Sequence, residues 1–338
     1  MGTFSRYRAF SILACATVAL ALTATFAHAG ENAPKGPQRV PVRHEISGDS
    51  FPYEVTDDDT SRSIAAHFGE PDDIVLLNGG EPEPGAKIVV DNRHVAPAEV
   101  ADGVVINIPQ RMLFVFRDGK LAEGWPATVG RPDWPTPLGS FFVASKRLNP
   151  TWHVPPAIRA EMEDEGIDPG SEVKPGPRNP LGKNFLGLDH GGIGIHATNR
   201  PLSIYLFGSH GCIRLNPDSA SKLFHMTAAS EPVEIIYQPV ALAVLSDGRI
   251  FLESDSDPYA MGVPHLPDVR EAARAAGVED KIDWQRASRV MVMVEGVARR
   301  IDKERPTVAD SAPQPKASPP AASNAAADDD QAEPNEQN

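Results

Sequence analysis

The residues with the clearest chemical potential are Cys212, His210 two positions before it and His196 16 positions before it. A cysteine nucleophile needs a nearby imidazole that lowers the pKa of the thiol and accepts its proton. Gly211 allows backbone angles that other residues resist, so consecutive N–H groups of this turn can face an oxyanion. Arg214 could bind a substrate carboxylate in bidentate fashion. The spacing therefore indicates attack of a thiolate on a carbonyl carbon.

Two other interpretations remain open at this point. His196, His210 and Cys212 are all zinc-binding residue types, so they could form a metal site. The segment could also be a structural turn without chemistry. Neither an H-E-x-x-H pattern nor a second cysteine after residue 29 supports a metal. We expect no metal ion and no cofactor.

Two sequence blocks resemble the signature of L,D-transpeptidases, the YkuD-type catalytic domain. They read GIHATN at residues 194–199 and SHGCIR at residues 209–214. Further segments are similar to motifs of the same family: TPLG at 136–139, NPTW at 149–152 and GPRNPLG at 176–182. The resemblance covers about residues 103–240. Ala197 stands where Gly or Ser is commoner in the family, so we expect a backbone carbonyl to orient His196.

The resemblance implies a mechanism. His196 would act as the proton acceptor and donor, and Cys212 would attack the third stem residue of a peptidoglycan tetrapeptide. The terminal D-alanine would leave, and an acceptor amine would resolve the thioester. His210, Gly211 and Cys212 would surround the oxyanion, and a side-chain role of His210 stays open. Hydrolysis of the same thioester and non-catalytic binding of the cell wall are the alternatives.

The expected substrate contacts are Ser209, Arg214, Asn199 and Trp152, although each also has a purely structural interpretation. The partners implied are peptidoglycan stem peptides and an outer-membrane lipoprotein as one candidate acceptor.

The N-terminus predicts export. Arg6 and Arg8 precede an apolar run that ends at the small-residue pattern Ala27-His28-Ala29, which is typical of a signal peptide cleaved after Ala29. An uncleaved membrane anchor is the alternative. Cleavage would remove residues 1–29 and both arginines, which changes the net charge from -14 to -16. We expect a periplasmic protein without a stable membrane span.

Residues 30–50 are polar and contain three prolines, so we expect a linker there. Residues 51–92 predict the order strand, helix, helix, strand, with Thr60 as the cap of the first helix. This order resembles a LysM module, a small peptidoglycan-binding fold. The matching positions are Tyr53, Val55, Asp59, Thr60, Ile64, Ala65, Phe68, Ile74, Asn78, Gly85 and Ile88.

The remaining segments predict a mainly β protein with some α structure. Residues 103–147 favour antiparallel strands with a tight hairpin at Asp118-Gly119, within the catalytic domain at 103–240. Residues 148–185 predict a lid with one helix near 157–165. Residues 241–304 predict an α+β extension with a hairpin, a helix at 269–275 and a strand at 290–297. Residues 305–338 are rich in Pro, Ala and Asp and predict a disordered tail.

The composition excludes several classes of protein. The 338 residues are 41% hydrophobic and 23% charged, which excludes collagen, long coiled coils and polytopic membrane proteins. The 46 acidic and 32 basic residues form no long basic run, so we expect no nucleic-acid partner. Two cysteines exclude a disulfide framework.

Overall fold

The computed structural model describes residues 39–72, 80–97 and 100–304. Four predicted features lie outside these residues: the signal peptide, residues 30–38 of the linker, the second helix at Ile74–Asn78 and the tail. No helix of the described segments has the length and apolarity needed to cross a membrane.

A nine-stranded sheet forms the centre of the catalytic part, in the order β14-β8-β15-β13-β12-β9-β16-β6-β7. Its strands are β6 (Gly103–Asn107), β7 (Met112–Arg117), β8 (Lys120–Gly130), β9 (Gly139–Leu148), β12 (Asn184–Leu188), β13 (Gly194–His196), β14 (Phe207–Ser209), β15 (Ile213–Leu215) and β16 (Pro232–Ile236). The long strand β8 pairs with β7 through its first part and with β15 near its end, so the sheet curls back on itself. The mainly β fold class is confirmed, but β14–β8, β13–β15 and β16–β6 are parallel pairs.

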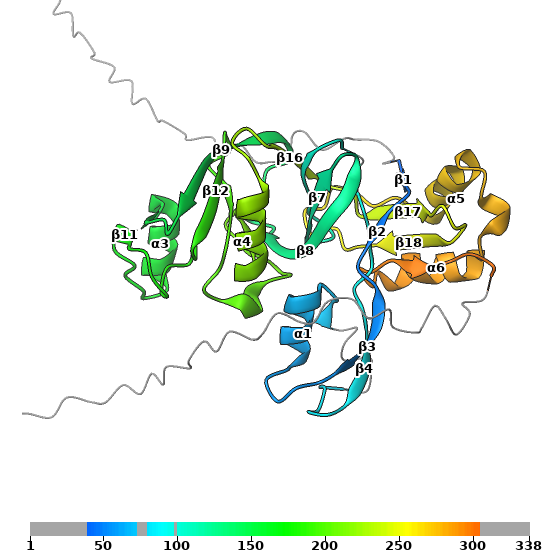
Figure 1. Ribbon diagram of the computed structural model, residues 1–338, viewed down its shortest axis with the longest axis horizontal. Coiled ribbons are helices and arrows are strands. Elements are labelled where there is room, and N and C mark those ends of the chain that lie inside the picture. Colours follow the sequence, from blue (N-terminus) through cyan, green and yellow to red (C-terminus); the bar gives the residue numbers. More distant parts are fainter. Residues whose placement is uncertain (1–38, 73–79, 98–99, 305–338) are drawn as a thin grey trace, which may run out of the picture. The chain divides into compact units, whose positions relative to one another are not determined.

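Local sequence chemistry accounts for several of these elements. Asp118 and Gly119 both have positive φ, 51° and 70°, as the predicted hairpin between β7 and β8 requires. Helix α4 (Pro217–Met226) begins where the Asn216 side chain accepts a hydrogen bond from the amide of Asp218. Its buried Ala220 and Leu223 lie one turn apart, and α4 packs against β12 (Figure 1).

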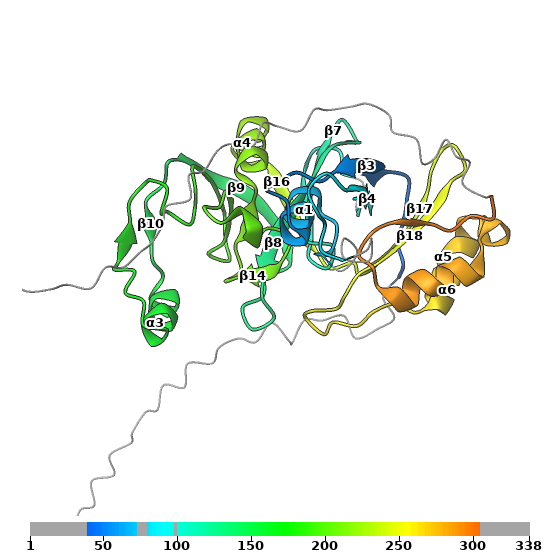
Figure 2. The same ribbon diagram turned by 90° about the horizontal axis from the view of Figure 1, so that it is seen from below.

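The segment between β9 and β12 is an excursion from the sheet. It contains β10 (Trp152–His153), α3 (Pro156–Asp164) and β11 (Glu172–Val173), and β10 pairs with β11. Figures 1 and 2 show this excursion, which we call the flap, beyond the ends of β9 and β12. Helix α3 has no fully buried residue, although Ile158 and Met162 are half-buried one turn apart.

Residues 50–91 contain β3 (Ser50–Glu54), α1 (Ser61–Phe68) and β4 (Lys87–Asp91), with β3 antiparallel to β4. Helix α1 has the predicted cap, because Thr60 and Ser63 exchange side-chain hydrogen bonds with each other's amides. Ile64 packs with Val55 and Val90 in a small separate core.

The expected linker is incorrect for residues 39–50. β1 (Val42–Arg43) runs parallel to β17, and β2 (Ile46–Ser47) pairs with β5 (His94–Val95). Val40 is buried with the apolar residues of the C-terminal extension. Short strands with only a few apolar residues leave too little periodicity for the sequence to reveal them.

The C-terminal extension contains β17 (Val240–Val244), β18 (Ile250–Ser254), α5 (Leu266–Ala275), α6 (Trp284–Met293) and β19 (Arg299–Arg300). A one-turn 3-10 helix of the extension lies at Glu279–Lys281, and another lies in the catalytic part at Pro201–Ser203. The hairpin and the helix near 269–275 occur as predicted. The strand predicted at 290–297 is wrong, because residues 290–293 belong to α6 and residues 294–297 form no strand.

The cause of this error lies at the start of α6. The Asp283 carboxylate accepts hydrogen bonds from the amides of Gln285 and Arg286, which begins a helix. Ala287 and Val290 are buried at helical spacing, while Val292 is 75% exposed. Val290 and Val292, which suggested a strand, thus lie on the buried and the exposed face of a helix.

Candidate active site

The pairing of β13 with β15 brings the two predicted motifs together. The two strands are parallel, with Ile195 opposite Ile213 and His196 opposite Arg214. Side chains alternate between the faces of a sheet, so His196 and Arg214 share one face. Cys212 lies directly before β15, two positions from Arg214 on that side. The register therefore places the expected imidazole and thiol on neighbouring chain segments.

The His196 ring is fixed by its surroundings. His196 is only 4% exposed, and its Nδ1 hydrogen-bonds the carbonyl oxygen of Ala197 at 2.5 Å. The ring stacks on Phe185 with centroids 6.1 Å apart. Gly194 must lack a Cβ because that atom would approach the Phe185 ring within 2.7 Å. The Ala197 carbonyl thus orients the His196 ring, as we expected because the Ala197 side chain has no hydroxyl.

Burial also governs the protonation of both groups. It lowers the pKa of His196 to about 4, and the Arg214 charge acts in the same direction, against the carbonyls of Ala197 and Leu181. Burial raises the pKa of the Cys212 thiol, although the Gly194 amide and Arg214 partly oppose it. Near neutral pH the pair consists of a neutral thiol and a neutral imidazole. The expected lowering of the thiol pKa is therefore not seen in the free protein.

The loop before Cys212 is closed by Ser209. The hydroxyl of Ser209 donates to the carbonyl oxygen of Cys212 at 2.5 Å and accepts from the amide of Gly211 at 3.1 Å. Gly211 has φ of +101°, which favours glycine. Ser209 is 1% exposed, so it supports the loop instead of making the expected substrate contact. The Gly211 amide is already bonded, which leaves the neighbouring amides as candidates for binding an oxyanion.

The side chain of His210 is bound by the flap. Its Nε2 lies 2.6 Å from Oε2 of Glu161 in α3 and 3.2 Å from Nη1 of Arg131. Arg131 also bonds Glu161 at 2.5 Å, and the Trp134 ring meets the His210 ring edge to face at 4.9 Å. These contacts connect the cysteine loop to the flap.

The other predicted contacts differ in their setting. Arg214 is half-buried, and no carboxylate of the described residues lies within ion-pair distance of its guanidinium. Its free positive charge beside Cys212 suits an anionic group of a ligand. Asn199 is exposed beyond the end of β13. Trp152 is half-buried in β10 of the flap.

Comparison with known proteins identifies the family of this domain. Residues 101–235 match the family model described as the L,D-transpeptidase catalytic domain. These residues belong to the L,D-transpeptidase family. The resemblance carried by the two sequence blocks is thereby confirmed.

The chain is similar to Probable L,D-transpeptidase YcfS of Escherichia coli, with 31% identity over 51% of this chain and 55% of that protein. It is 28% identical to Probable L,D-transpeptidase ErfK/SrfK of Salmonella typhimurium, over 72% of this chain and 83% of that protein. The solved catalytic domain of an L,D-transpeptidase from E. faecium is 25% identical, over 40% of this chain and 96% of that one, with a TM-score of 0.31. The chain spans about half the length of the first of these relatives.

His196, His210 and Cys212 are the residues of the metal site that the sequence left open. Within residues 39–72, 80–97 and 100–304, no three His, Cys, Asp or Glu side chains are grouped as ligands. Glu161 of the flap binds His210, and the Ala197 carbonyl binds Nδ1 of His196. Of the three residues of the hypothetical zinc site, His210 thus binds the flap, whereas His196 and Cys212 lie on neighbouring chain segments.

Sequence reasoning missed four residues around the cysteine loop of this L,D-transpeptidase domain. They are Arg131, Thr136, Glu161 and Tyr259. The TPLG block pointed to Thr136 only as part of a turn, yet its side chain is buried and donates to the Gly211 carbonyl at 2.9 Å. Glu161 lay in the predicted lid helix, without a signal for its partner. No pattern indicated Tyr259.

Proposed function

We propose that the protein is an L,D-transpeptidase that acts on peptidoglycan tetrapeptide stems through a thioester on Cys212. The observation that carries this proposal is the parallel register of β13 and β15, which joins His196 to the segment of Cys212. The neutral state of both groups also supports it, because a neutral imidazole can accept a proton from a neutral thiol.

The chemistry begins with proton transfer. Nδ1 of His196 donates to the Ala197 carbonyl, so Nε2 carries the lone pair and accepts the thiol proton. The Cys212 sulfur bonds to the carbonyl carbon of the third stem residue, and the oxygen becomes an oxyanion. The Cys212 amide is the candidate donor to this oxyanion, since the Gly211 amide is bonded to Ser209. The amide C–N bond then breaks, and D-alanine leaves with the proton from His196.

The second half of the cycle reverses these steps. An acceptor amine gives up a proton to His196 and attacks the thioester carbon, which forms an amide and restores the thiol. Arg214 would bind a carboxylate of the stem peptide, because its guanidinium is half-buried beside the cysteine and lacks an acidic partner among the described residues. Asn199 and Trp152 remain proposed substrate contacts.

We place this activity in the periplasm of a diderm bacterium, on the basis of the predicted signal peptide with cleavage after Ala29. Residues 51–92 would bind peptidoglycan as a LysM-like module and keep the catalytic domain near its substrate. A stem peptide, for 3–3 crosslinks, or an outer-membrane lipoprotein would supply the acceptor amine.

Product analysis by mass spectrometry tests the proposal. The mature protein is incubated with purified tetrapeptide muropeptides, with and without a lysine-containing acceptor peptide. Transpeptidation predicts D-alanine release together with a product joined to the acceptor. A tripeptide alone would instead establish a hydrolase that uses the same cysteine. No D-alanine release by the wild type, together with unchanged binding of peptidoglycan by Cys212→Ala, would mean that the protein only binds the cell wall.

A further inference from the structure

A tyrosine of the C-terminal extension reaches the segment that supports the cysteine loop. The hydroxyl of Tyr259 donates to the carbonyl oxygen of Gly130 at 2.8 Å and accepts from the amide of Thr136 at 3.0 Å. Gly130 and Thr136 also bond to each other, from the Gly130 amide to the Thr136 hydroxyl at 2.8 Å. Tyr259 lies outside the part of the chain that matches the catalytic-domain family. It therefore fastens both ends of the turn between β8 and β9 from outside that domain.

This turn holds the peptide group that precedes the cysteine. Thr136 Oγ1 donates to the carbonyl oxygen of Gly211 at 2.9 Å. The Gly211 carbonyl and the Cys212 amide belong to one planar peptide unit, in which C=O and N–H point in opposite directions. Fixing the carbonyl therefore fixes the direction of the Cys212 amide and the start of its side chain. Two hydrogen bonds thus separate the Tyr259 hydroxyl from the peptide group that we propose binds the oxyanion.

Tyr259 is itself held firmly. Its amide donates to the hydroxyl of Tyr237 at 3.1 Å, and the two rings stack with centroids 5.6 Å apart. The Asp257 carboxylate accepts from the Tyr237 hydroxyl and from the amides of Met261 and Gly262, at 2.9 and 2.8 Å. These bonds tie the loop from Asp257 to Gly262 into a rigid support.

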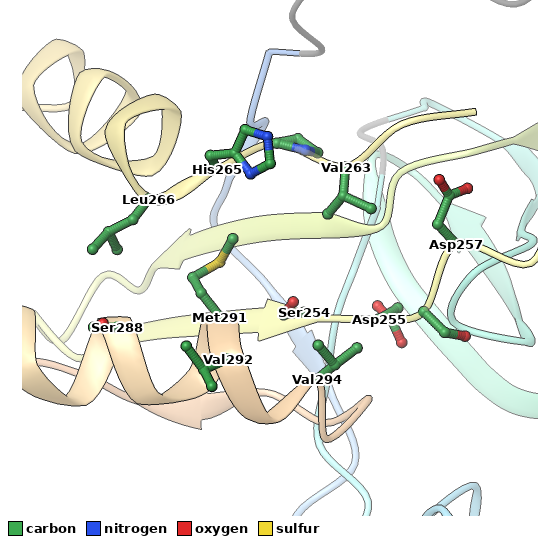
Figure 3. A pocket seen from close by; sticks show the side chains of 12 residues that line it. Ser254, Asp255, Asp257, Val263, His265, Leu266, Ser288, Met291, Val292 and Val294 are labelled. Atoms are coloured by element: carbon green, nitrogen blue, oxygen red, sulfur yellow. The ribbon is translucent and has the colours of Figure 1, made fainter. Parts of the chain in front are cut away.

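The two ends of the loop from Asp257 to Gly262 border a cavity. Figure 3 shows Asp257 and Val263, which flank the loop, at the edge of a cavity of about 440 Å³ in the extension. Tyr259 and Met261 of the loop also pack against the main hydrophobic core, which adds to the hold of these hydrogen bonds.

We propose that Tyr259 is a positioning residue for Cys212, and that the C-terminal extension is thereby an essential part of the catalytic unit. The inference rests on the proposed function for its effect on catalysis, but the effect on the thiol is independent of it. Loss of the hydroxyl frees the turn at 130–136 and lets the Gly211–Cys212 peptide rotate. The half-buried thiol then becomes more accessible while its alignment with a carbonyl substrate is lost.

The test uses the full mature chain and the variant Tyr259→Phe, which keeps the stacked ring. Two rates are measured in the folded protein: alkylation of Cys212 by iodoacetamide, and acylation by a tetrapeptide muropeptide. We expect alkylation to rise, its pH profile to shift, and acylation to fall about tenfold or more, because small misplacements of reacting groups cost up to about 10²-fold. Trp284→Phe is the matched control, since it removes an indole hydrogen bond to the Glu279 carbonyl elsewhere in the extension.

Opposite changes of the two rates in Tyr259→Phe, with wild-type rates in Trp284→Phe, would support the proposal. Unchanged alkylation and an unchanged pH profile would overturn it, as would equal effects of the two variants. Asp257→Asn provides a second variant that loosens the same loop without touching Tyr259, and it should act in the same direction. If the wild type alkylates normally but never acylates, the proposed function fails, while the alkylation data still decide the role of Tyr259.

Discussion

Replacing Thr136 by valine removes a buried hydroxyl at almost constant volume. That hydroxyl makes two hydrogen bonds, one to the Gly211 carbonyl and one from the Gly130 amide. Thr136 is 1% exposed, so water cannot replace either partner. A buried polar group that loses its partner costs about 1–3 kcal/mol. The valine variant leaves two such groups unpaired, and local movement relieves part of the cost. We therefore expect its free energy of unfolding to be lower by about 2–4 kcal/mol.

The matched control is Thr136→Ser, which keeps both hydrogen bonds and loses one methyl group, for about 1 kcal/mol. Denaturant unfolding gives the free energies, and acylation of Cys212 by a tetrapeptide gives the functional effect. We expect the valine variant to be clearly less stable than the serine variant and slower in acylation, because the Gly211–Cys212 peptide is no longer fixed. Equal stability and equal acylation of the two variants would refute this reasoning.

Three further predictions concern charge and protonation. Glu161→Gln removes the charge that binds the flap to His210, so amide hydrogen exchange in α3 should accelerate, whereas Glu163→Gln in the same helix should leave it unchanged. Burial raises the pKa of Glu70 to about 8, so the folded protein loses stability as pH rises from about 4.5 to 8. Glu70→Gln should therefore raise the free energy of unfolding by about 3 kcal/mol at pH 7 and have no effect at pH 4 in denaturation experiments, and an equal gain at both values would contradict this. Burial raises the pKa of the Cys212 thiol, so its alkylation rate should keep increasing with pH beyond the pH at which the rate of a free thiol levels off. A plateau of the rate below pH 7 would contradict a neutral resting pair.

The sequence predicts features that depend on local chemistry. The cap of α1 at Thr60 and the hairpin at Asp118-Gly119 each follow from the conformational preferences of a few adjacent residues. The pairing of His196 with Cys212 was also predicted, from the chemistry of a thiol and an imidazole and from the resemblance of the two sequence blocks. The strand expected at 290–297 failed because Asp283 starts a helix whose buried face is set by tertiary packing.

The contacts that surround the cysteine loop were beyond sequence reasoning. Glu161 lies 49 positions from His210, and Tyr259 lies 123 positions from Thr136. No periodicity or turn preference encodes such pairs, since they result from how distant segments pack. The direction of the thiol pKa has the same origin, because burial depends on the assembled fold.

Mass spectrometry of the intact protein after brief incubation with a tetrapeptide muropeptide tests the central claim most directly. The account predicts a covalent adduct equal to the substrate minus D-alanine, located on Cys212 by peptide mapping and lost on addition of an acceptor amine. Cys212→Ala should form no adduct, and His196→Ala should form it much more slowly. Release of D-alanine at the wild-type rate by Cys212→Ala, or an adduct on another residue, would contradict the account.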